Sequence, residues 1–171
     1  PVDRRDPSTH TLRWAEGFIR GYMAARPGVR AYLERAKAFA RRNGYVTDVF
    51  GRVRWIPEIA SSQKKVRAEG ERKAVNMPIQ AGAAGVLRKA MGELVRLQGK
   101  GRLDEYIRGG VVRPVLQVYD ELIFEVKRGL EEEVGGVVKE VMEGAAPWLS
   151  VPLKVDVEMG PSWGELAKVN L

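Results

Sequence analysis

The sequence predicts an α+β fold, in which helices come first and a small antiparallel sheet with packed helices follows. Three observations predict it. Apolar residues recur with helical spacing through most of residues 12–97. Two β-branched and aromatic runs flank an Asp-Glu pair within residues 115–126, and apolar and charged residues alternate from 151 to 159. With 171 residues, 44% of them hydrophobic, the chain is long enough for one ordinary domain or two small lobes.

Two helices are predicted near the start of the chain. Ser8 or Thr9 is suited to cap the first helix, which should end near Ala25. Its apolar stripe consists of Leu12, Trp14, Ala15, Phe18, Ile19, Tyr22 and Met23. Pro27 suits the first position of the second helix, and Gly44 suits its end. The predicted buried face of that second helix consists of Val29, Tyr32, Leu33, Ala36, Phe39 and Ala40.

The middle of the chain predicts a short hairpin and then a long, charged helical region. Residues 44–57 have the composition of two short strands. Residues 62–76 are highly charged and helical in pattern, but Pro78 should interrupt this helix, because proline lacks the backbone N–H of a helix interior. A further helix should run to about Leu97. Residues 99–110 are rich in Gly and charge, and we expect a linker there.

A tight hairpin with acids at its tip is predicted in the second half. The runs 115–119 and 122–126 have the length and composition of strands, so Asp120 and Glu121 fall at the turn. A carboxylate pair held in such a turn is well placed to bind a metal ion. Asp is also common in turns for local reasons. These residues alone therefore leave both interpretations open.

The remainder of the chain predicts one helix and one strand. A helix is predicted over residues 130–146, with its apolar side chains packed on the back of the sheet. Residues 151–159 alternate with a period of two, as in a half-buried strand. We therefore expect residues 111–126 and 151–159 to share one antiparallel sheet, covered on one face by the helix.

Composition limits the kinds of site and partner. The absence of Cys and the single His10 exclude thiolate and His-cluster metal sites, so a metal here must be a hard, oxygen-bound ion. The net charge of +7 favours polyanion partners. No apolar run approaches the roughly 20 residues of a membrane helix, and the charged residues 1–10 do not resemble a signal peptide.

Two segments of the chain resemble motifs of one known family. Residues 116–122 run Leu-Gln-Val-Tyr-Asp-Glu-Leu. They resemble the Leu-Gln-Val-His-Asp-Glu-Leu motif of family A DNA polymerases, the bacterial polymerase I type. Residues 71–84 resemble that family's Glu-Arg-x-Ala-x-Asn-x-Pro-x-Gln-Gly-Thr-Ala-Ala-Asp. Residues 18–32, 44–57 and 151–163 resemble further family segments in the same order, so the resemblance covers nearly the whole chain.

The chain departs from the family pattern at a few positions. Tyr119 stands where the family usually has His, and Ala81-Gly82 stands in place of Gly-Thr. Asp48 and Val53 depart from the pattern of the short hairpin. The departure at Tyr119 matters most, because it adjoins the acids.

The resemblance implies a division into two subdomains and a role for the hairpin acids. Residues 1–66 would be the C-terminal part of the fingers and residues 67–171 the C-terminal part of the palm. Asp120 would be a catalytic magnesium ligand, and Glu121 would support the metal or its water shell. Tyr119 would touch the backbone of the primer end through its hydroxyl.

A second group of residues is implied in DNA binding. Arg72, Asn76 and Gln80 are spaced four apart, so they share one face of a helix. Their donors and acceptors suit the minor groove, where acceptor atoms occur on every base pair. By resemblance these three contact DNA near the primer end; without it, a solvated polar face is the better interpretation. Arg52 and Arg54 would form a basic ridge near the template, or are arginines exposed to solvent.

The resemblance also implies a cofactor and partners. Two Mg²⁺ ions would be shared with an Asp of an upstream segment that has no counterpart in this sequence, and the family's triphosphate-gripping helix is likewise absent. A partner chain carrying the N-terminal polymerase half is therefore expected, together with primer–template DNA and deoxynucleoside triphosphates, and no membrane. The isolated chain should be inactive. The implied location is cytoplasmic and nucleoid-associated, or that of a viral protein acting in a bacterial cytoplasm.

Two other hypotheses remain from the sequence. The first is a non-catalytic basic module that binds duplex DNA by its backbone and minor groove. A structural or interaction domain has only the Glu-Lys helix near residues 131–143 in its favour, and such a face is usually solvated. A partner chain that supplies the absent motifs would favour the enzyme.

Overall fold

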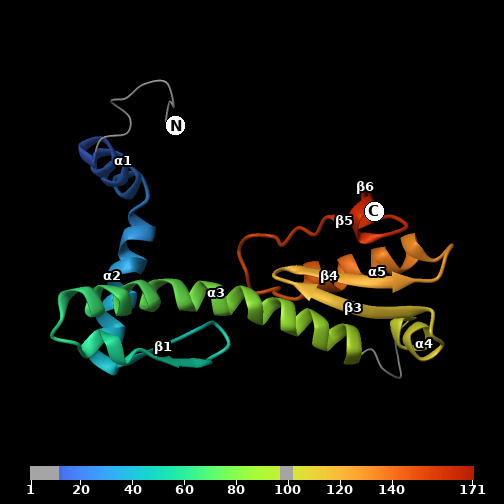
Figure 1. Cartoon of the computed structure of the whole chain (residues 1–171), viewed down its shortest axis with the longest axis horizontal. Coiled ribbons are helices and arrows are strands. Elements are labelled where there is room, and N and C mark those ends of the chain that lie inside the picture. Colours follow the sequence, from blue (N-terminus) through green and yellow to red (C-terminus); the bar gives the residue numbers. More distant parts are fainter. Residues whose placement is uncertain (1–11, 97–101) are drawn as a thin grey trace. The chain divides into compact units, whose positions relative to one another are not determined.

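The computed structural model describes residues 12–96 and 102–171. Contacts divide the chain into two compact units, Pro1–Gln80 and Ala81–Leu171, and helix α3 contributes residues to both. Each unit is described by itself below (Figure 1). The mixture of helices with small antiparallel sheets confirms the predicted α+β class. The subdomain boundary at residues 66 and 67 stays a prediction.

The N-terminal unit is a set of helices around one short hairpin. It consists of α1 (Leu12–Ala25), α2 (Pro27–Asn43), β1 (Tyr45–Thr47), β2 (Val53–Trp55), the 3₁₀ helix η2 (Pro57–Ala60) and the first part of α3 (Lys64–Arg96). Gly44 ends α2 in the left-handed conformation, at φ +77°, and its N–H donates to the carbonyl of Ala40, as predicted from its position. The core consists of Ala40, Val46, Ile56, Ile59 and Ala74, with Phe39 and Met77 packed against it.

Helix α1 has the predicted apolar stripe, but none of its residues is buried. Leu12 is 77% exposed, and Phe18 and Ile19 are both more than half exposed. The predicted buried face of α2 is only partly correct, since Ala40 is buried whereas Val29 is 39% exposed. The start of α1 at Ser8 or Thr9 lies outside the described residues. The N-terminal unit therefore presents a continuous apolar helix face that no described residue covers fully.

Helix α3 runs from Lys64 to Arg96 without a break, so the predicted interruption at Pro78 is wrong. Pro78 removes one backbone donor, which normally weakens or kinks a helix. Packing compensates here: Ala74, four residues earlier, is fully buried in the core. The Tyr32 hydroxyl also donates a 2.9 Å hydrogen bond to the carbonyl of Val75, three residues before the proline. Tertiary contacts thus outweigh the local cost.

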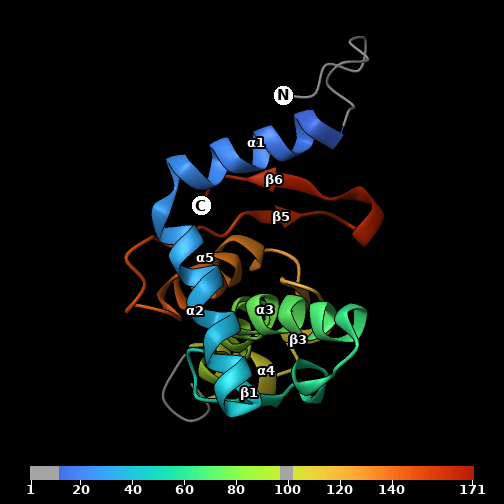
Figure 2. The same ribbon diagram turned by 90° about the vertical axis from the view of Figure 1, so that its left-hand side faces the viewer.

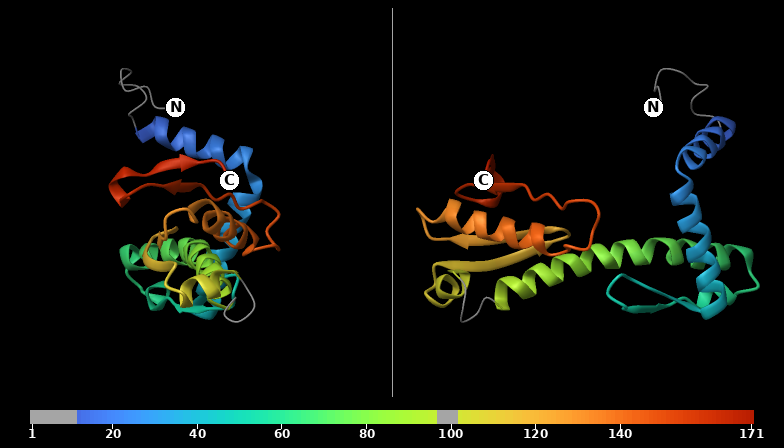
Figure 3. Two further views of the ribbon diagram at one scale, coloured as in Figure 1. Left: turned by 90° about the vertical axis from the view of Figure 1, so that its right-hand side faces the viewer. Right: turned by 180° about the vertical axis from the view of Figure 1, so that it is seen from behind.

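The C-terminal unit is built on a two-stranded hairpin with helices around it. It consists of the rest of α3, α4 (Arg102–Arg108), β3 (Val112–Val118), β4 (Glu121–Val126), α5 (Glu131–Gly144), β5 (Val157–Met159), the 3₁₀ helix η3 (Trp163–Glu165) and β6 (Ala167–Val169). Its core consists of Leu94, Leu103, Val112, Val134 and Val138. Leu122 and Phe124 of β4 pack against these residues, so α5 covers the hairpin as predicted (Figure 3).

The sheet prediction is wrong in one respect. Strands β3 and β4 form one two-stranded sheet, and β5 pairs with β6 in another, so residues 111–126 and 151–159 share no sheet. Only residues 157–159 of the predicted strand are paired, and β5 lies between β6 and α5 (Figure 2). The N–H of Val155 donates instead to a carboxylate oxygen of Glu143 on α5, at 3.0 Å. A side chain thus satisfies the backbone where a neighbouring strand was expected.

The predicted linker at residues 99–110 is also wrong for residues 102–108, which form α4. Leu103 is only 1% exposed, and Tyr106 and Ile107 pack against the same core. Their spacing of three and four places them on one side of a helix. The Gly-rich and charged composition concealed this short apolar face. Within the described part of the chain, no helix is long and apolar enough to cross a membrane.

Gly70 lets η2 approach α3 closely. A Cβ added at Gly70 would lie 2.9 Å from the backbone N of Ile59 and 3.1 Å from the carbonyl carbon of Glu58. Gly92, in the same helix, has open space where its Cβ would be. The two glycines therefore offer a matched test of this packing.

We predict that Gly70→Ala lowers the free energy of unfolding by about 1–3 kcal/mol, because the backbone of η2 must move to admit a methyl group. Gly92→Ala should raise it by roughly 0.5–1 kcal/mol, since alanine is the better helix former. Urea denaturation followed by circular dichroism measures both. Equal effects of the two substitutions would mean that the contact at Gly70 is unimportant.

Candidate functional site

The hairpin turn presents Tyr119, Asp120 and Glu121 to solvent. Tyr119 and Asp120 form the two-residue turn, while Glu121 is already the first residue of β4 and pairs with Val118. The acid pair is thus shifted by one residue from the predicted tip. All three side chains are exposed, and Tyr119 is 91% exposed. The β3–β4 ladder and α5 hold the turn at the end of a packed element.

Tyr119 has φ +53°, the left-handed region that side chains rarely adopt. A positive φ at the first turn position suits hairpins because it matches the twist of the strands, and glycine usually provides it. The side-chain amide of Gln117 donates to the Tyr119 carbonyl at 3.2 Å and steadies the turn. The turn therefore directs an exposed phenol outward beside Asp120 at a cost in backbone strain.

The carboxylates present do not form a metal site by themselves. Among residues 12–96 and 102–171, no group of three Asp, Glu or His side chains is arranged to hold a metal ion. Magnesium needs about six oxygen ligands in a nearly octahedral arrangement. Asp120 is an exposed carboxylate in the turn between two paired strands, so it is chemically suited to provide one of those ligands. The other ligands of such a site must come from water, substrate or other chain segments.

Arg72, Asn76 and Gln80 lie on one exposed face of α3, as predicted. Four residues advance a helix by about 40°, so the three side chains fall within an arc of about 80°. The opposite side of the helix carries Ala74 and Met77, which belong to the core. Burial of that side therefore forces the three polar side chains outward.

The neighbours of Arg72 on α3 are occupied by ion pairs. Glu71 pairs with Arg41 at 2.5 Å, and Lys73 pairs with Glu58 at 2.5 Å and Glu69 at 2.8 Å. The hydrogen bond from Arg41 lowers the pKa of the Glu71 carboxyl, and that from Lys73 lowers the pKa of Glu58. Arg72 forms no ion pair with another residue in the described part of the chain, so its guanidinium is available to a ligand.

The β1–β2 hairpin is closed by a buried ion pair. Asp48 is 7% exposed and accepts hydrogen bonds from the backbone N–H groups of Phe50 (2.9 Å) and Arg52 (3.0 Å). Its other oxygen accepts from the Arg52 guanidinium at 2.7 Å and 2.5 Å. Burial raises the pKa of Asp48, but the hydrogen bonds from Arg52 and Phe50 outweigh it, and the pKa falls below its usual value. Arg52 thus closes the turn, whereas Arg54 is exposed.

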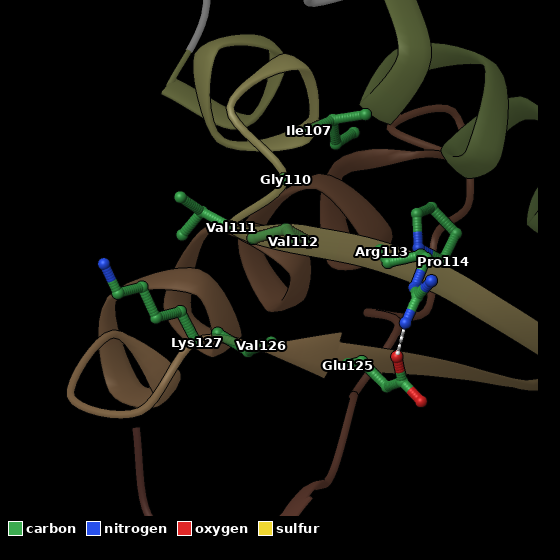
Figure 4. A pocket seen from close by; sticks show the side chains of 9 residues that line it. All are labelled: Ile107, Gly110, Val111, Val112, Arg113, Pro114, Glu125, Val126 and Lys127. Carbon is green, nitrogen blue, oxygen red and sulfur yellow. Dashed lines mark hydrogen bonds and ion pairs between the residues drawn. The ribbon is translucent and has the colours of Figure 1, made fainter.

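A surface pocket of about 450 Å³ lies at the base of the β3–β4 hairpin, not at its acidic tip (Figure 4). Val112 begins β3 and Val126 ends β4, and both line the pocket. Arg113 and Glu125 form an ion pair at its rim, at 2.5 Å. The opposite ends of one hairpin therefore carry this pocket and Asp120, so the pocket is not the candidate metal position.

The positive charge of the chain is concentrated in its N-terminal unit. Residues 1–80 contain 17 Lys and Arg against 8 Asp and Glu, a net charge of +9. Residues 81–171 contain 12 against 14, a net charge of −2. The unit with Arg72, Asn76 and Gln80 is therefore the one that attracts a polyanion.

Comparison with known proteins decides the family. The model of DNA polymerase family A matches residues 9–165. The chain belongs to DNA polymerase family A. It is 43% identical over 152 residues to the thermostable DNA polymerase I of Thermus filiformis, which is 88% of this chain and 17% of that protein. It is 44% identical over 154 residues to DNA polymerase I of Rhizobium leguminosarum, which is 88% of this chain and 15% of that protein.

A solved member of the family has the same fold. The POL domain of Pol1 from M. smegmatis, in complex with DNA primer-template and dNTP, matches with a TM-score of 0.73 and 37% identity. The match covers 84% of this chain and 24% of that one. The resemblance predicted from the motifs is therefore confirmed, although the shared sheet predicted from the alternating residue patterns is not present. The chain spans less than a fifth of the curated relatives' length.

The roles of the predicted site residues stay predictions, and two structural features around them were not predicted from the sequence. The departure from the family pattern at Asp48 was evident, yet its role as the acceptor that closes the hairpin was not. The signal was the spacing of four between Asp48 and Arg52 across a Gly-containing turn. The strain at Tyr119 had no signal, since Tyr is not a residue expected at positive φ.

We predict that Asp48→Asn lowers the free energy of unfolding at pH 7 by about 1–3 kcal/mol, the scale of lost hydrogen bonds to a buried charged group. The folded-state pKa of Asp48 is lowered, so its contribution is complete above the unfolded value of about 4 and is lost as pH falls through the folded pKa. The difference between wild type and variant should therefore shrink below pH 4. Asp156→Asn removes an exposed pair with Lys168 and is the control, with little expected effect.

We predict that Tyr119→Gly raises the free energy of unfolding by roughly 0.5–1 kcal/mol, because relief of left-handed strain exceeds the added freedom of the unfolded chain. Tyr119→Phe keeps the strain and should leave stability unchanged, since the side chain is almost fully exposed. Thermal unfolding measures both variants. A destabilised glycine variant would show that Tyr119 is held there by contacts and not against strain.

Proposed function

We propose that the chain is the C-terminal fingers–palm segment of a DNA-directed DNA polymerase, which extends a primer 3′ end on a template. The observation that carries the proposal is the family match over residues 9–165, which includes the Arg72–Gln80 face and the Asp120 turn. The relatives are named DNA polymerase I, and the structural neighbour holds primer–template DNA and dNTP. Replication and repair synthesis are the processes that such an activity serves.

In this proposal the hairpin turn supplies one edge of the catalytic centre. Asp120 provides a carboxylate for a magnesium site whose other ligands come from outside the described residues, and Glu121 orients that carboxylate or its water shell. A magnesium site held in part by Asp120 would, when loaded, supply the positive charge that favours ionisation of the primer hydroxyl and neutralises the triphosphate. Tyr119 directs its hydroxyl toward the primer backbone. The attacking group is the primer 3′ hydroxyl, so no nucleophile is required from the protein.

The exposed face of α3 is proposed to hold the duplex next to the primer end. Arg72, Asn76 and Gln80 offer donors to the acceptor atoms that every base pair presents in the minor groove. Contacts of this kind test the shape of a pair without selecting its sequence, which template copying requires. Arg54 adds an exposed positive charge on the same unit, whereas Arg52 is already engaged by Asp48.

Exposed apolar surface supports the need for further polymerase parts. No residue of α1 is fully buried, and Val115 and Leu116 of β3 are 51% and 46% exposed in a sheet for which the described residues provide two strands. Surfaces of this kind are aggregation hazards unless another element covers them. We propose that the additional length of the relatives contains that element, either in the same polypeptide or in a partner chain.

One second function has a specific observation in its favour. The N-terminal unit carries a net charge of +9, and the described residues contain no group of three metal-ligating side chains. A basic module that binds duplex DNA without chemistry would have both properties. The two functions differ in what Asp120 does, since only a polymerase needs that carboxylate.

We predict that Arg72→Ala weakens binding of the chain to a labelled primer–template by about 1–3 kcal/mol, the scale of a hydrogen bond to a charged group. The loss should depend little on base sequence. Arg88→Ala, an exposed arginine on the same helix, is the matched control. Fluorescence anisotropy measures the affinities, and equal losses for both variants would argue for general charge attraction.

A different variant tests synthesis, in the enzyme assembled with its remaining polymerase segment. Asp120→Asn should abolish primer extension there and leave primer–template binding intact. If Asp120→Asn still extends the primer, this chain does not provide a catalytic carboxylate, and the non-catalytic DNA-binding module describes it better. Extension by the chain alone would overturn the proposed need for further parts.

A further inference from the structure

The β1–β2 hairpin exposes a tryptophan at the end of a row of aromatic rings. The ring of Phe39, which packs against the N-terminal core, meets Tyr45 edge-on with centroids 5.6 Å apart. Tyr45 in turn meets Trp55 with centroids 5.2 Å apart and an angle of 65° between their planes. Trp55 is nevertheless 70% exposed. The row anchors the indole to the core and leaves most of its surface open.

The strand register explains why Trp55 faces outward. Tyr45 pairs with Trp55 and Thr47 pairs with Val53, so these four residues share one face of the hairpin. Val46 lies on the other face and is only 2% exposed, which identifies that face as the one toward the core. Val53 is 51% exposed beside Trp55. The outer face of the hairpin is therefore an exposed, largely apolar platform centred on one indole.

The charge around this platform indicates its occupant. The platform belongs to the N-terminal unit, whose residues carry a net charge of +9; Arg54, next to Trp55 in sequence, pairs with Val46 and lies on the other face of the hairpin. A hydrophobic protein partner would gain little from such a charge, whereas a nucleic acid needs both cations for its phosphates and flat apolar surface for its bases. Only unpaired bases expose their faces for stacking, so the matching ligand is single-stranded.

We propose that Trp55 is a stacking platform for a base of single-stranded nucleic acid, with the arginines of the N-terminal unit attracting the flanking phosphates. Within the proposed polymerase function, on which this inference rests, the ligand is the unpaired template strand. The buried Asp48–Arg52 pair is a positioning element, because it closes the hairpin that presents Trp55.

The test compares a fluorescein-labelled oligothymidylate with an abasic oligomer of equal length and phosphate charge. Stacking on one aromatic ring contributes about 1–3 kcal/mol, so the wild-type chain should bind the thymidylate roughly fivefold to a hundredfold more tightly than the abasic strand. Trp55→Ala should lose most of this preference while its affinity for the abasic strand stays the same. Trp55→Tyr should retain most of it.

Trp163→Ala provides the matched control, since Trp163 is 58% exposed and belongs to the other unit. It should bind both strands as the wild type does. Circular dichroism checks that Trp55→Ala is folded. If that variant unfolds, the wild-type preference and the Trp55→Tyr variant decide the question. Equal wild-type affinity for the two strands, or no loss in Trp55→Ala, would overturn the proposal and leave the platform to a protein partner.

The result is separable from the proposed function. If Arg72→Ala does not weaken primer–template binding but the wild type still prefers thymidylate to the abasic strand, the proposed DNA-binding role of α3 is wrong and the single-strand site at Trp55 stands. If Arg72→Ala weakens primer–template binding but the wild type binds thymidylate and the abasic strand equally, the proposed function stands and the stacking role of Trp55 is wrong.

Discussion

The burial of one side of helix α3 is the constraint on which most of this structure depends. Ala74 of that helix is fully buried in the N-terminal core, and Leu94 is 4% exposed in the C-terminal one. Each unit therefore needs its own stretch of α3 to remain helical. The same burial turns Arg72, Asn76 and Gln80 toward solvent, so a requirement of packing creates the polar face proposed to bind DNA.

The hairpin and the helices were predictable from the sequence because their signals are local. Alternating apolar residues identified β3 and β4, and Pro27 and Gly44 marked the ends of α2 closely. The errors arose where a distant residue replaces a local partner. Glu143 satisfies the backbone at Val155, and burial of Ala74 offsets the cost of Pro78. Neither contact can be derived from residues near in sequence.

The candidate site shows the same division. The residue types at Asp120 and Arg72 were recognised by their motifs, and the helix spacing correctly placed Arg72, Asn76 and Gln80 together. The conformation of Tyr119 and the engagement of Arg52 by Asp48 could not be predicted, because they depend on turn geometry and burial. A motif identifies which groups are available, whereas the fold determines which of them already have a partner.

The proline in α3 has a consequence for how the chain unfolds. Pro78 lies two residues before Gln80, where the two units divide, and has no amide hydrogen, so the carbonyl of Ala74 lacks its usual helical partner. The helix has one backbone hydrogen bond fewer at this point, so opening the helix here breaks fewer bonds than opening it elsewhere. Hydrogen exchange should accordingly resolve two cooperative blocks, one on each side of the proline. Such a result would mean that one continuous helix belongs to two units that open separately.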